Sequence, residues 1–495
     1  MRIDDSANGI SGNGIERHDG SLASSVRSYR WQFVFAMVAG LLLRLWFIFR
    51  HEYISGDSLV YGDLARNLLE HHVYGLSVVL DGVAAPPRPT LIRLPGYPLF
   101  LALCFRLFGI GRYLPVLLVQ AVVDLGTCGL IAALAKRIFG RRAVPAALWL
   151  SVLCPFTANY VAAPLTETLT LFCIALAFYS LSRWEGALGQ GGRNGLNGWF
   201  GSLAFALAFA ILLRPEQGLL AVAIVPAFAW ALLRRASLQG GRVWVPVLLL
   251  VVLVGLPLVP WTARNWITFH VIQPLAPRFA MDPGELNPTG FQRWYRTWAV
   301  DFISTDNVYW SYDGHVIEIG DLPSRAFDSP DEYAATEALL RNYNEDQNPT
   351  PALDSRFAQL AAERIQANPF RYYFELPVAR VLDMVLRPRT EMLPVPLDWW
   401  RFREHRTASF FALSYALLNL AFFCLAGRTL RRREMWKGDE LLVVSMLSMM
   451  LLRFALLLTL DNSEPRYTLE FFPVVIVLAA AAFGSEALEE VRRSS

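Results

Sequence analysis

The sequence predicts an all-α polytopic membrane protein with about ten spanning helices, further interfacial helices and a mixed loop domain on the outer face. Of the 495 residues, 54% are hydrophobic and 18% are charged, whereas soluble proteins carry about 25% charged residues. The hydrophobic residues come in blocks of about 17 to 22, the length that an α-helix needs to cross a bilayer. Because lipid offers no water to unpaired backbone groups, each of these blocks must be a helix.

The cysteines and the net charge exclude several other classes of protein. All five cysteines lie inside apolar segments, and neither a CxxC motif nor a His/Cys ligand spacing occurs. The sequence therefore indicates neither a disulfide framework nor a zinc site. The net charge of +3 is small for a chain of this length, and we expect membrane lipid but no nucleic acid as a partner.

The N-terminal segment, residues 1–30, is rich in Ser, Gly and Asp and is predicted to be disordered and cytoplasmic. It is too long and too acidic for the charged region of a signal peptide. No small-x-small cleavage site follows the apolar run 31–49. We therefore expect that run to remain in the protein as the first spanning helix.

Clusters of arginine and lysine set the expected topology, because short basic loops stay on the cytoplasmic side. Four such clusters lie at 135–142, 183–193, 234–242 and 427–437. We expect both termini inside. The N-terminal membrane module is expected at 31–263 and the outer-face segment at 264–405. The C-terminal helices follow at 406–486 and the cytoplasmic tail at 487–495. The blocks expected to cross are 31–49, 113–134, 143–163, 165–182, 197–213, 216–233, 243–262, 409–426, 440–459 and 470–484.

One apolar segment, 94–110, is predicted not to cross. After its opening "LPGYP", only Leu99–Ile110 is apolar, and Arg106 interrupts it. Twelve residues with a rise of about 1.5 Å each cover about 18 Å, whereas the hydrocarbon core is about 30 Å thick. We expect an interfacial or re-entrant helix at 97–109, which places the loop 50–93 on the outer face.

The first outer loop contains "SGDSLVYGDLARNL", in which Asp57 begins a predicted surface helix. An aspartate in this position can cap the free backbone N–H groups of the helix, or it can serve catalysis. Both interpretations of Asp57 stay open. Asp63 is expected on the solvated face of the same helix.

The other outer loops bring arginines and carboxylates, but no lysine, to the same face. A single arginine there can simply extend its charge to the membrane surface. Together they suit a lipid-linked phosphate, because the guanidinium fork matches phosphate oxygens and keeps its charge in a poorly hydrated site. The candidate residues are Arg93 in "RLPGYP", Glu167 in "PLTETL", Arg214 and Glu216 in "LLRPEQG", Arg264 in "PWTARNW", and Arg466 and Tyr467 in "EPRYTLEFFP".

The outer segment 264–405 is rich in aromatic residues and in Gly, Pro and Asn. Its aromatic side chains can stack on sugar rings, or they can pack together and anchor the segment at the interface. Residues 354–367 show an apolar face at helical spacing, with Asp354 as the expected N-cap. Asn368–Pro369 is expected to end this helix.

Seven motifs, in order along residues 31–475, resemble the GT-C membrane glycosyltransferases. The resemblance is closest to family 39 and its relatives, the dolichyl-phosphate-mannose protein mannosyltransferases and the bacterial aminoarabinose transferases. It implies a polyprenyl-phosphate sugar donor, an outer-loop aspartate matched by Asp57, and an acidic residue at the mouth of a later helix matched by Glu167. Asp57 is followed by Ser58 instead of a second acid, and no β-trefoil domain is visible, which weighs against a protein acceptor. The motifs are "SGDSLVYGDLARNL", "RLPGYPLF", "AKRIFGRR", "PLTETL", "LLRPE", "PWTARNW" and "EPRYTLEFFP".

The expected reaction is inverting transfer of a sugar from a polyprenyl-phosphate-linked donor to a hydroxyl of a glycan, lipid or protein acceptor. Asp57 is expected to be the general base, and Glu167 to orient the acceptor or the sugar. The arginines are expected to hold the departing phosphate, with Arg214, Arg264 and Arg466 the best candidates and Arg93 less certain. No cofactor is expected to be required, and a divalent cation stays open. The expected location is the outer face of a bacterial cytoplasmic (inner) membrane.

The alternative from another class is a flippase or exporter of lipid-linked sugars. Transporters place polar groups near the bilayer midplane, whereas the expected spans of this chain hold few charges, notably Arg44, Asp124 and Arg453. The gathering of polar residues at one face favours an enzyme. A non-catalytic membrane scaffold is a third and more distant possibility.

Overall fold

The computed structural model describes residues 16–54, 56–80, 82–188, 196–235, 244–431 and 439–484. Helix α1 begins at Glu16, so helix covers the second half of the segment that we predicted to be disordered. The apolar run 31–49 already forms a helix, and its backward extension therefore needs no new nucleus. Residues 1–15 and the predicted tail 487–495 lie outside the described residues.

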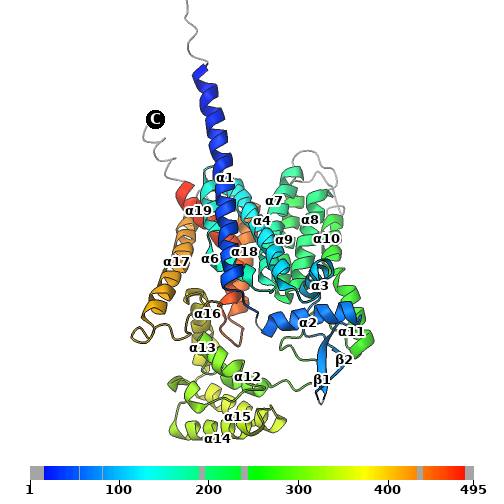
Figure 1. Cartoon of the computed structure of the whole chain (residues 1–495), viewed down its shortest axis with the longest axis vertical. Coiled ribbons are helices and arrows are strands. Elements are labelled where there is room, and N and C mark those ends of the chain that lie inside the picture. The colour runs from blue at the N-terminus through cyan, green and yellow to red at the C-terminus, as the bar shows by residue number, and fades with distance from the viewer. Residues whose placement is uncertain are drawn as a thin grey trace, which may run out of the picture.

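The described chain is an all-α polytopic membrane protein whose long helices run side by side (Figure 1). The elements on the first half are α1 Glu16–Arg50, α2 Gly56–Glu70, β1 Gly75–Leu80, β2 Val83–Pro89, α3 Gly96–Phe108, α4 Tyr113–Phe139, α5 Ala143–Val152, α6 Pro155–Asn159, α7 Glu167–Leu188, α8 Gly198–Leu213, α9 Gly218–Arg235, α10 Trp244–Gly255 and α11 Leu258–Phe269. The second half holds α12 Thr289–Tyr295, α13 Phe302–Ser304, α14 Pro330–Asp346, α15 Pro351–Ala367, α16 Leu376–Leu386, α17 Arg406–Leu430, α18 Glu440–Leu457 and α19 Phe472–Gly484.

Fewer of the described helices are long and apolar enough to cross a membrane than the ten that we predicted. The described residues hold seven such helices, or eight if α10 and α11, which are bent by 42°, form one span. The two remaining blocks are α7 and α8. Helix α8 has 16 residues, or about 24 Å of rise, and α7 carries Glu167 and Arg183 near its ends, which lowers its mean hydropathy.

Helix α3 has the predicted short length, 13 residues. Its first residue, Gly96, lies against α8: a Cβ at this position would be 2.5 Å from the carbonyl oxygen of Leu212. Only glycine permits this approach. The contact brings the loop before α3 close to the loop after α8, and these loops carry Arg93 and Arg214.

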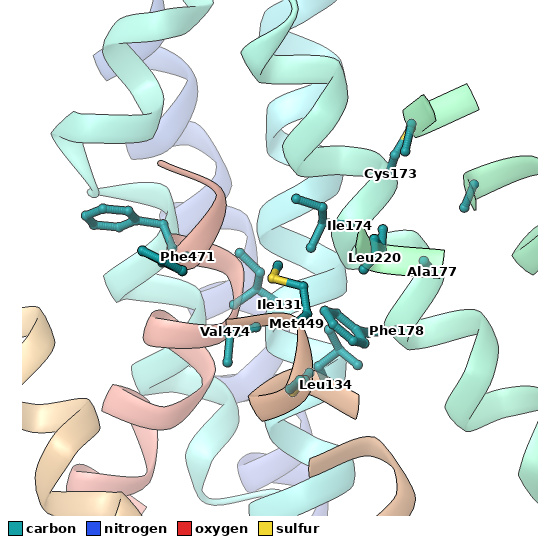
Figure 2. Packing of buried hydrophobic residues seen from close by; sticks show 14 of the residues in the cluster. Ile131, Leu134, Cys173, Ile174, Ala177, Phe178, Leu220, Met449, Phe471 and Val474 are labelled. Carbon is teal, nitrogen blue, oxygen red and sulfur yellow. The ribbon is translucent and has the colours of Figure 1, made fainter. Parts of the chain in front are cut away.

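Helix α19 is the most enclosed spanning helix. Of its apolar window, 78% is buried, compared with 28% for α1 and 22% for α17. Figure 2 shows Val474 of α19, Ile131 of α4, Phe178 of α7 and Met449 of α18 in one cluster of buried side chains. The segment that precedes α19, which carries Arg466, is therefore held at the centre of the bundle.

The charges inside the spans near α1 neutralise each other. Arg44 donates from Nε to Oδ2 of Asp124 at 2.7 Å, and both side chains are buried. The same guanidinium donates to the carbonyl oxygens of Gly40 and Val152 at 2.8 Å. A buried charge is tolerated when it is paired and fully hydrogen-bonded in this way, so this pair is structural.

Helix α2, the hairpin and helices α12–α15 gather at one end of the bundle (Figure 1). Strands β1 and β2 are antiparallel, with Gly75 opposite Pro89. Asp63 of α2 accepts hydrogen bonds from the N–H and the hydroxyl of Ser77, both at 2.6 Å, and so fastens the hairpin to the helix. The loops 50–93 and 264–405 thus lie at the same end, as the topology prediction requires.

The outer segment has its own hydrophobic core, which contains Trp294, Tyr295, Trp298 and Phe357. For these aromatic residues the packing interpretation is confirmed, because none is more than 1% exposed. Helix α15 ends at Ala367, where we predicted an end, but its N-cap is Thr350, whose side chain accepts from the N–H of Leu353. The prediction of Asp354 as the cap was wrong; its carboxylate accepts from the N–H of Phe291 at 2.9 Å.

Candidate functional site

Asp57 lies in the first turn of α2 between two arginines from distant parts of the chain. Its Oδ1 is 2.8 Å from Nη2 of Arg93, and its Oδ2 is 2.9 Å from Nη1 of Arg466. The carboxylate is 24% exposed. Burial alone would raise the pKa of Asp57, but the guanidinium groups of Arg466 and Arg93 hold it well below its usual range. Asp57 is therefore ionised.

Glu464 shares Arg466 with Asp57. One of its oxygens forms a close ion pair with Nε of Arg466, while Oε2 is buried and has no hydrogen-bond partner in the described part of the chain. Burial raises the pKa of Glu464 to about 7, although the charge of Arg466 opposes this. This carboxylate therefore titrates near neutral pH.

A second group of charges surrounds Arg214, which follows α8 directly. Its Nη1 is 3.1 Å from Oε1 of Glu167, and its Nε is 2.7 Å from Oε1 of Glu216. Glu167 also lies 4.0 Å from Nε of Arg466. The two groups therefore join through Glu167.

The row of charges continues into the bundle. Arg453 of α18 donates from Nη2 to Glu470 at 3.0 Å and lies 3.7 Å from Glu216. Gln217 donates to the other oxygen of Glu470 at 2.5 Å. Arginines and carboxylates alternate along the row, so almost every charge has an opposite neighbour. We call the following residues the charge network: Arg93, Asp57, Arg466, Glu464, Glu167, Arg214, Glu216, Arg453 and Glu470.

Two cavities meet at this network. The smaller, of about 310 Å³, is lined by five arginines and three carboxylates, and we call it the arginine cavity. The larger, of about 870 Å³, is lined by five carboxylates and three arginines, and we call it the carboxylate cavity. Both are lined by Asp57, Arg93, Arg466 and Tyr467. Asp57 therefore borders both cavities.

Most of the site residues that the sequence predicted come together in the arginine cavity. Seven of the eight line it, namely Asp57, Arg93, Glu167, Arg214, Glu216, Arg466 and Tyr467. The ring of Tyr467 lies 5.8 Å from the guanidinium carbon of Arg214 and 5.7 Å from that of Arg466. Four loops that are far apart in the sequence thus supply these seven residues.

Arg264 is not brought to this cavity. Its guanidinium donates to the carbonyl oxygens of Tyr74 at 2.6 Å and Thr90 at 2.8 Å. Tyr74 and Thr90 flank the hairpin, so Arg264 holds the base of the hairpin against α11. Its role as a phosphate ligand stays a prediction that this geometry does not support.

Several residues of the site were not among the sequence candidates. Arg278, Arg453 and Tyr61 also line the arginine cavity, and Glu470 and Glu464 complete the charge network. For Arg453 a signal was present, because an ionisable residue inside a span marks a functional site by default. Arg278 stands in an irregular loop, where neither spacing nor periodicity distinguishes it.

A metal site is not evident in the charge network. Among the described residues, the one group with metal-ligand proximity is Asp398, Glu404 and His405, outside both cavities. Clusters of exposed acidic residues of this kind are common without an ion. The expectation that no metal is required stays a prediction.

The sequence comparison supports the resemblance drawn from the motifs. Residues 88–261 match the family model described as dolichyl-phosphate-mannose-protein mannosyltransferase. This range contains Arg93, Glu167, Arg214 and Glu216, whereas Asp57 and Arg466 lie outside it. The recognition of the chain as similar to the GT-C glycosyltransferases is confirmed. No curated protein matches the chain.

Two solved structures are distantly similar to this chain. ArnT from Cupriavidus metallidurans bound to undecaprenyl phosphate is 13% identical, with 92% of this chain and 77% of that chain covered and a TM-score of 0.38. The oligosaccharyltransferase of Archaeoglobus fulgidus, in complex with Zn and sulfate, is 12% identical, with 93% and 50% covered and a TM-score of 0.43. The chain thus spans half the length of the archaeal protein. Similarity at this level does not transfer a substrate.

Proposed function

We propose that this chain, part of which matches a family of lipid-phosphate-dependent mannosyltransferases, is a membrane glycosyltransferase. It transfers a hexose or pentose from a polyprenyl-phosphate-linked donor to an acceptor hydroxyl, with inversion, at the outer face of the membrane. The observation that carries the proposal is the position of Asp57, held by Arg93 and Arg466 where the two cavities meet.

The arginine cavity suits the donor phosphate. Five arginines, Arg93, Arg214, Arg278, Arg453 and Arg466, line it against three carboxylates. Guanidinium groups stabilise the charge that develops on a departing phosphate when they are placed before the reaction begins. Apolar side chains in the same wall suit the first isoprene units of the lipid, namely Leu165, Leu213, Leu456 and Leu460.

The pairing of Asp57 explains how the base is activated. Two arginines stabilise its ionised form, and an aspartate with so low a pKa is a weak base. A donor phosphate in the arginine cavity competes for Arg93 and Arg466. As these contacts weaken, the pKa of Asp57 rises, and its basicity increases when the donor is in place.

The reaction is then a single displacement. The acceptor oxygen forms a bond to the anomeric carbon on the face opposite the phosphate, and Asp57 takes the acceptor proton. The bond from the anomeric carbon to the phosphate oxygen breaks, and its electron pair leaves with the polyprenyl phosphate. Arg466 and Arg214 stabilise this charge, while Glu167, held by Arg214, orients the sugar.

The direct test is release of polyprenyl phosphate by the purified full chain in vesicles. The donor is an undecaprenyl-phosphate-linked sugar, and a mixture of envelope glycolipids is added as acceptor. We expect undecaprenyl phosphate and the glycosylated acceptor to form at the same rate. An exporter, the alternative function, would move the donor across the vesicle membrane without releasing undecaprenyl phosphate. Movement without release would overturn the proposed function.

The titration of Glu464 predicts a pH dependence of donor binding. With a pKa of about 7, Glu464 is mostly neutral at pH 6 and mostly ionised at pH 8. Ionised Glu464 competes with the donor phosphate for Arg466, whereas the charge of the phosphodiester does not change in this range. We expect the KM for the donor to rise about five- to tenfold from pH 6 to pH 8, and this rise to disappear in Glu464→Gln.

The pH dependence of protein stability provides an independent check of the raised pKa of Glu464. Because its pKa in the folded chain lies above the usual 4.5, Glu464 favours the folded state most below pH 4.5, and this contribution is lost as the pH rises through 7. The Tm of Glu464→Gln in detergent should therefore fall less between pH 6 and pH 8 than that of the unmodified protein. Equal pH dependence of both Tm and KM in the two proteins would contradict the assignment.

A further inference from the structure

The carboxylate cavity has the opposite charge balance to the arginine cavity. Five arginines and three carboxylates line the arginine cavity, whereas three arginines and five carboxylates, including Asp306, Glu391 and Asp461, line the carboxylate cavity. Glu464 lines the carboxylate cavity as well. A chamber of about 870 Å³ with this lining is large enough for at least one sugar ring.

We propose that the carboxylate cavity binds the acceptor, and that the acceptor is a sugar bearing hydroxyl or amino groups and no phosphate near the reacting hydroxyl. The inference rests on the proposed function, because the donor phosphate has to occupy the arginine cavity. The inference adds the chemical class of the second substrate, the acceptor, which binds in the carboxylate cavity.

Two buried carboxylate oxygens lack partners in this cavity. Oε1 of Glu391 accepts from the hydroxyl of Tyr160 at 2.8 Å, but its Oε2 is buried and has no hydrogen-bond partner among the described residues. The same holds for Oε2 of Glu464, whose side chain is 6% exposed. A buried acceptor without a donor costs free energy. A ligand with O–H or N–H groups supplies the missing donors.

Asp306 adds a carboxylate that lies outside the ion pairs of the cavity. In the described ranges it forms no ion pair with an arginine or lysine, in contrast to Asp461, which lies 3.2 Å from Arg296. The pKa of Asp306 is raised by burial and lowered in part by Arg387. Its carboxylate repels a phosphate group and attracts an amine.

The aromatic wall of the cavity suits a sugar ring. Trp310 is 43% exposed, and its ring meets that of Phe302 edge to face at 5.4 Å. Tyr53 lies on the same cavity, and burial together with Asp306 raises the pKa of its phenol. An aromatic face covers the C–H side of a sugar, while polar groups bond its hydroxyls. Trp310 is thus one of several exposed aromatic residues of the outer segment, and it lines this cavity.

The test compares three small probes that differ in one substituent: octyl β-glucoside, its 2-amino analogue and its 6-phosphate. Each is titrated into the full chain in lipid nanodiscs, and binding is followed by calorimetry. We expect the amino glycoside to bind most tightly and the phosphate about tenfold more weakly than the neutral glucoside. Asp306→Asn and Glu391→Gln should each reduce this discrimination severalfold. Asp346→Asn, an exposed aspartate of the same segment outside both cavities, is the matched control.

The outcomes separate this inference from the proposed function. If the phosphorylated glycoside binds as tightly as the neutral one, or if discrimination survives in both cavity variants, the inference is wrong. Binding of undecaprenyl phosphate, measured in the same nanodiscs, should be unchanged in Asp306→Asn and Glu391→Gln. If undecaprenyl phosphate does not bind the unmodified protein at all, the proposed function fails, whatever the glycosides do. Equal Tm values of the variants show that they are folded.

Discussion

Replacement of Asp57 by asparagine is expected to lower the rate of sugar transfer by about 10²- to 10⁴-fold, the range that a general base contributes. Asparagine keeps the shape of the side chain and can still accept from Arg93, but it cannot take the acceptor proton. The loss should therefore appear in kcat. The measurement is release of undecaprenyl phosphate in vesicles, over a range of donor concentrations.

Donor binding should respond in the opposite direction. Without the negative charge of Asp57, Arg93 and Arg466 lose a competitor for the donor phosphate. The KM for the donor should consequently fall or stay constant in Asp57→Asn. Glu70→Gln, an exposed carboxylate in the last turn of the same helix, is the control and should keep full activity. A folded Asp57→Asn protein with normal kcat would show that another group takes the proton.

Seven of the eight predicted residues line one cavity because topology restricts where their loops can lie. Basic clusters placed five loops on one face, and loops on one face of a helical bundle have little room to stay apart. Asp57, Glu167, Arg214 and Arg466 were therefore predicted without any knowledge of their distances. The pairing of Asp57 with both Arg93 and Arg466 could not be predicted, because residues 57 and 466 are far apart in the sequence and only the fold brings them together.

Where the structure places a predicted residue away from the cavity, the local sequence was equally compatible with two environments. Arg264 directly follows a predicted spanning block on the expected face, as a phosphate ligand would, yet it lies within α11 and donates to the backbone beside the hairpin. No periodicity predicts that a hairpin will lie there. The carboxylate cavity shows the same limit: Asp306 and Glu391 are far apart in an irregular segment, and only the fold makes them neighbours of the network.

The second large effect is expected at Arg466, which contacts Asp57 and Glu464 and borders both cavities. Loss of one preorganised donor to a developing charge costs about 10²- to 10³-fold in kcat, and we expect Arg466→Gln to fall in this range. Arg466→Lys should recover little, because an ammonium group cannot bond two carboxylates and a phosphate with a planar fork. The variants are compared by the rate of undecaprenyl phosphate release.

Arg466 also keeps two carboxylates from repelling each other, so a lower rate could reflect a disturbed fold. The double variant Arg466→Gln with Asp57→Asn resolves this, because it removes the arginine together with one of the charges that would be left unpaired. Because Arg466 stabilises the departing phosphate and Asp57 takes the acceptor proton, the two losses in rate should multiply in the double variant, whereas its Tm should exceed that of Arg466→Gln. A double variant no slower than Asp57→Asn alone would instead mean that Arg466 acts only through the base.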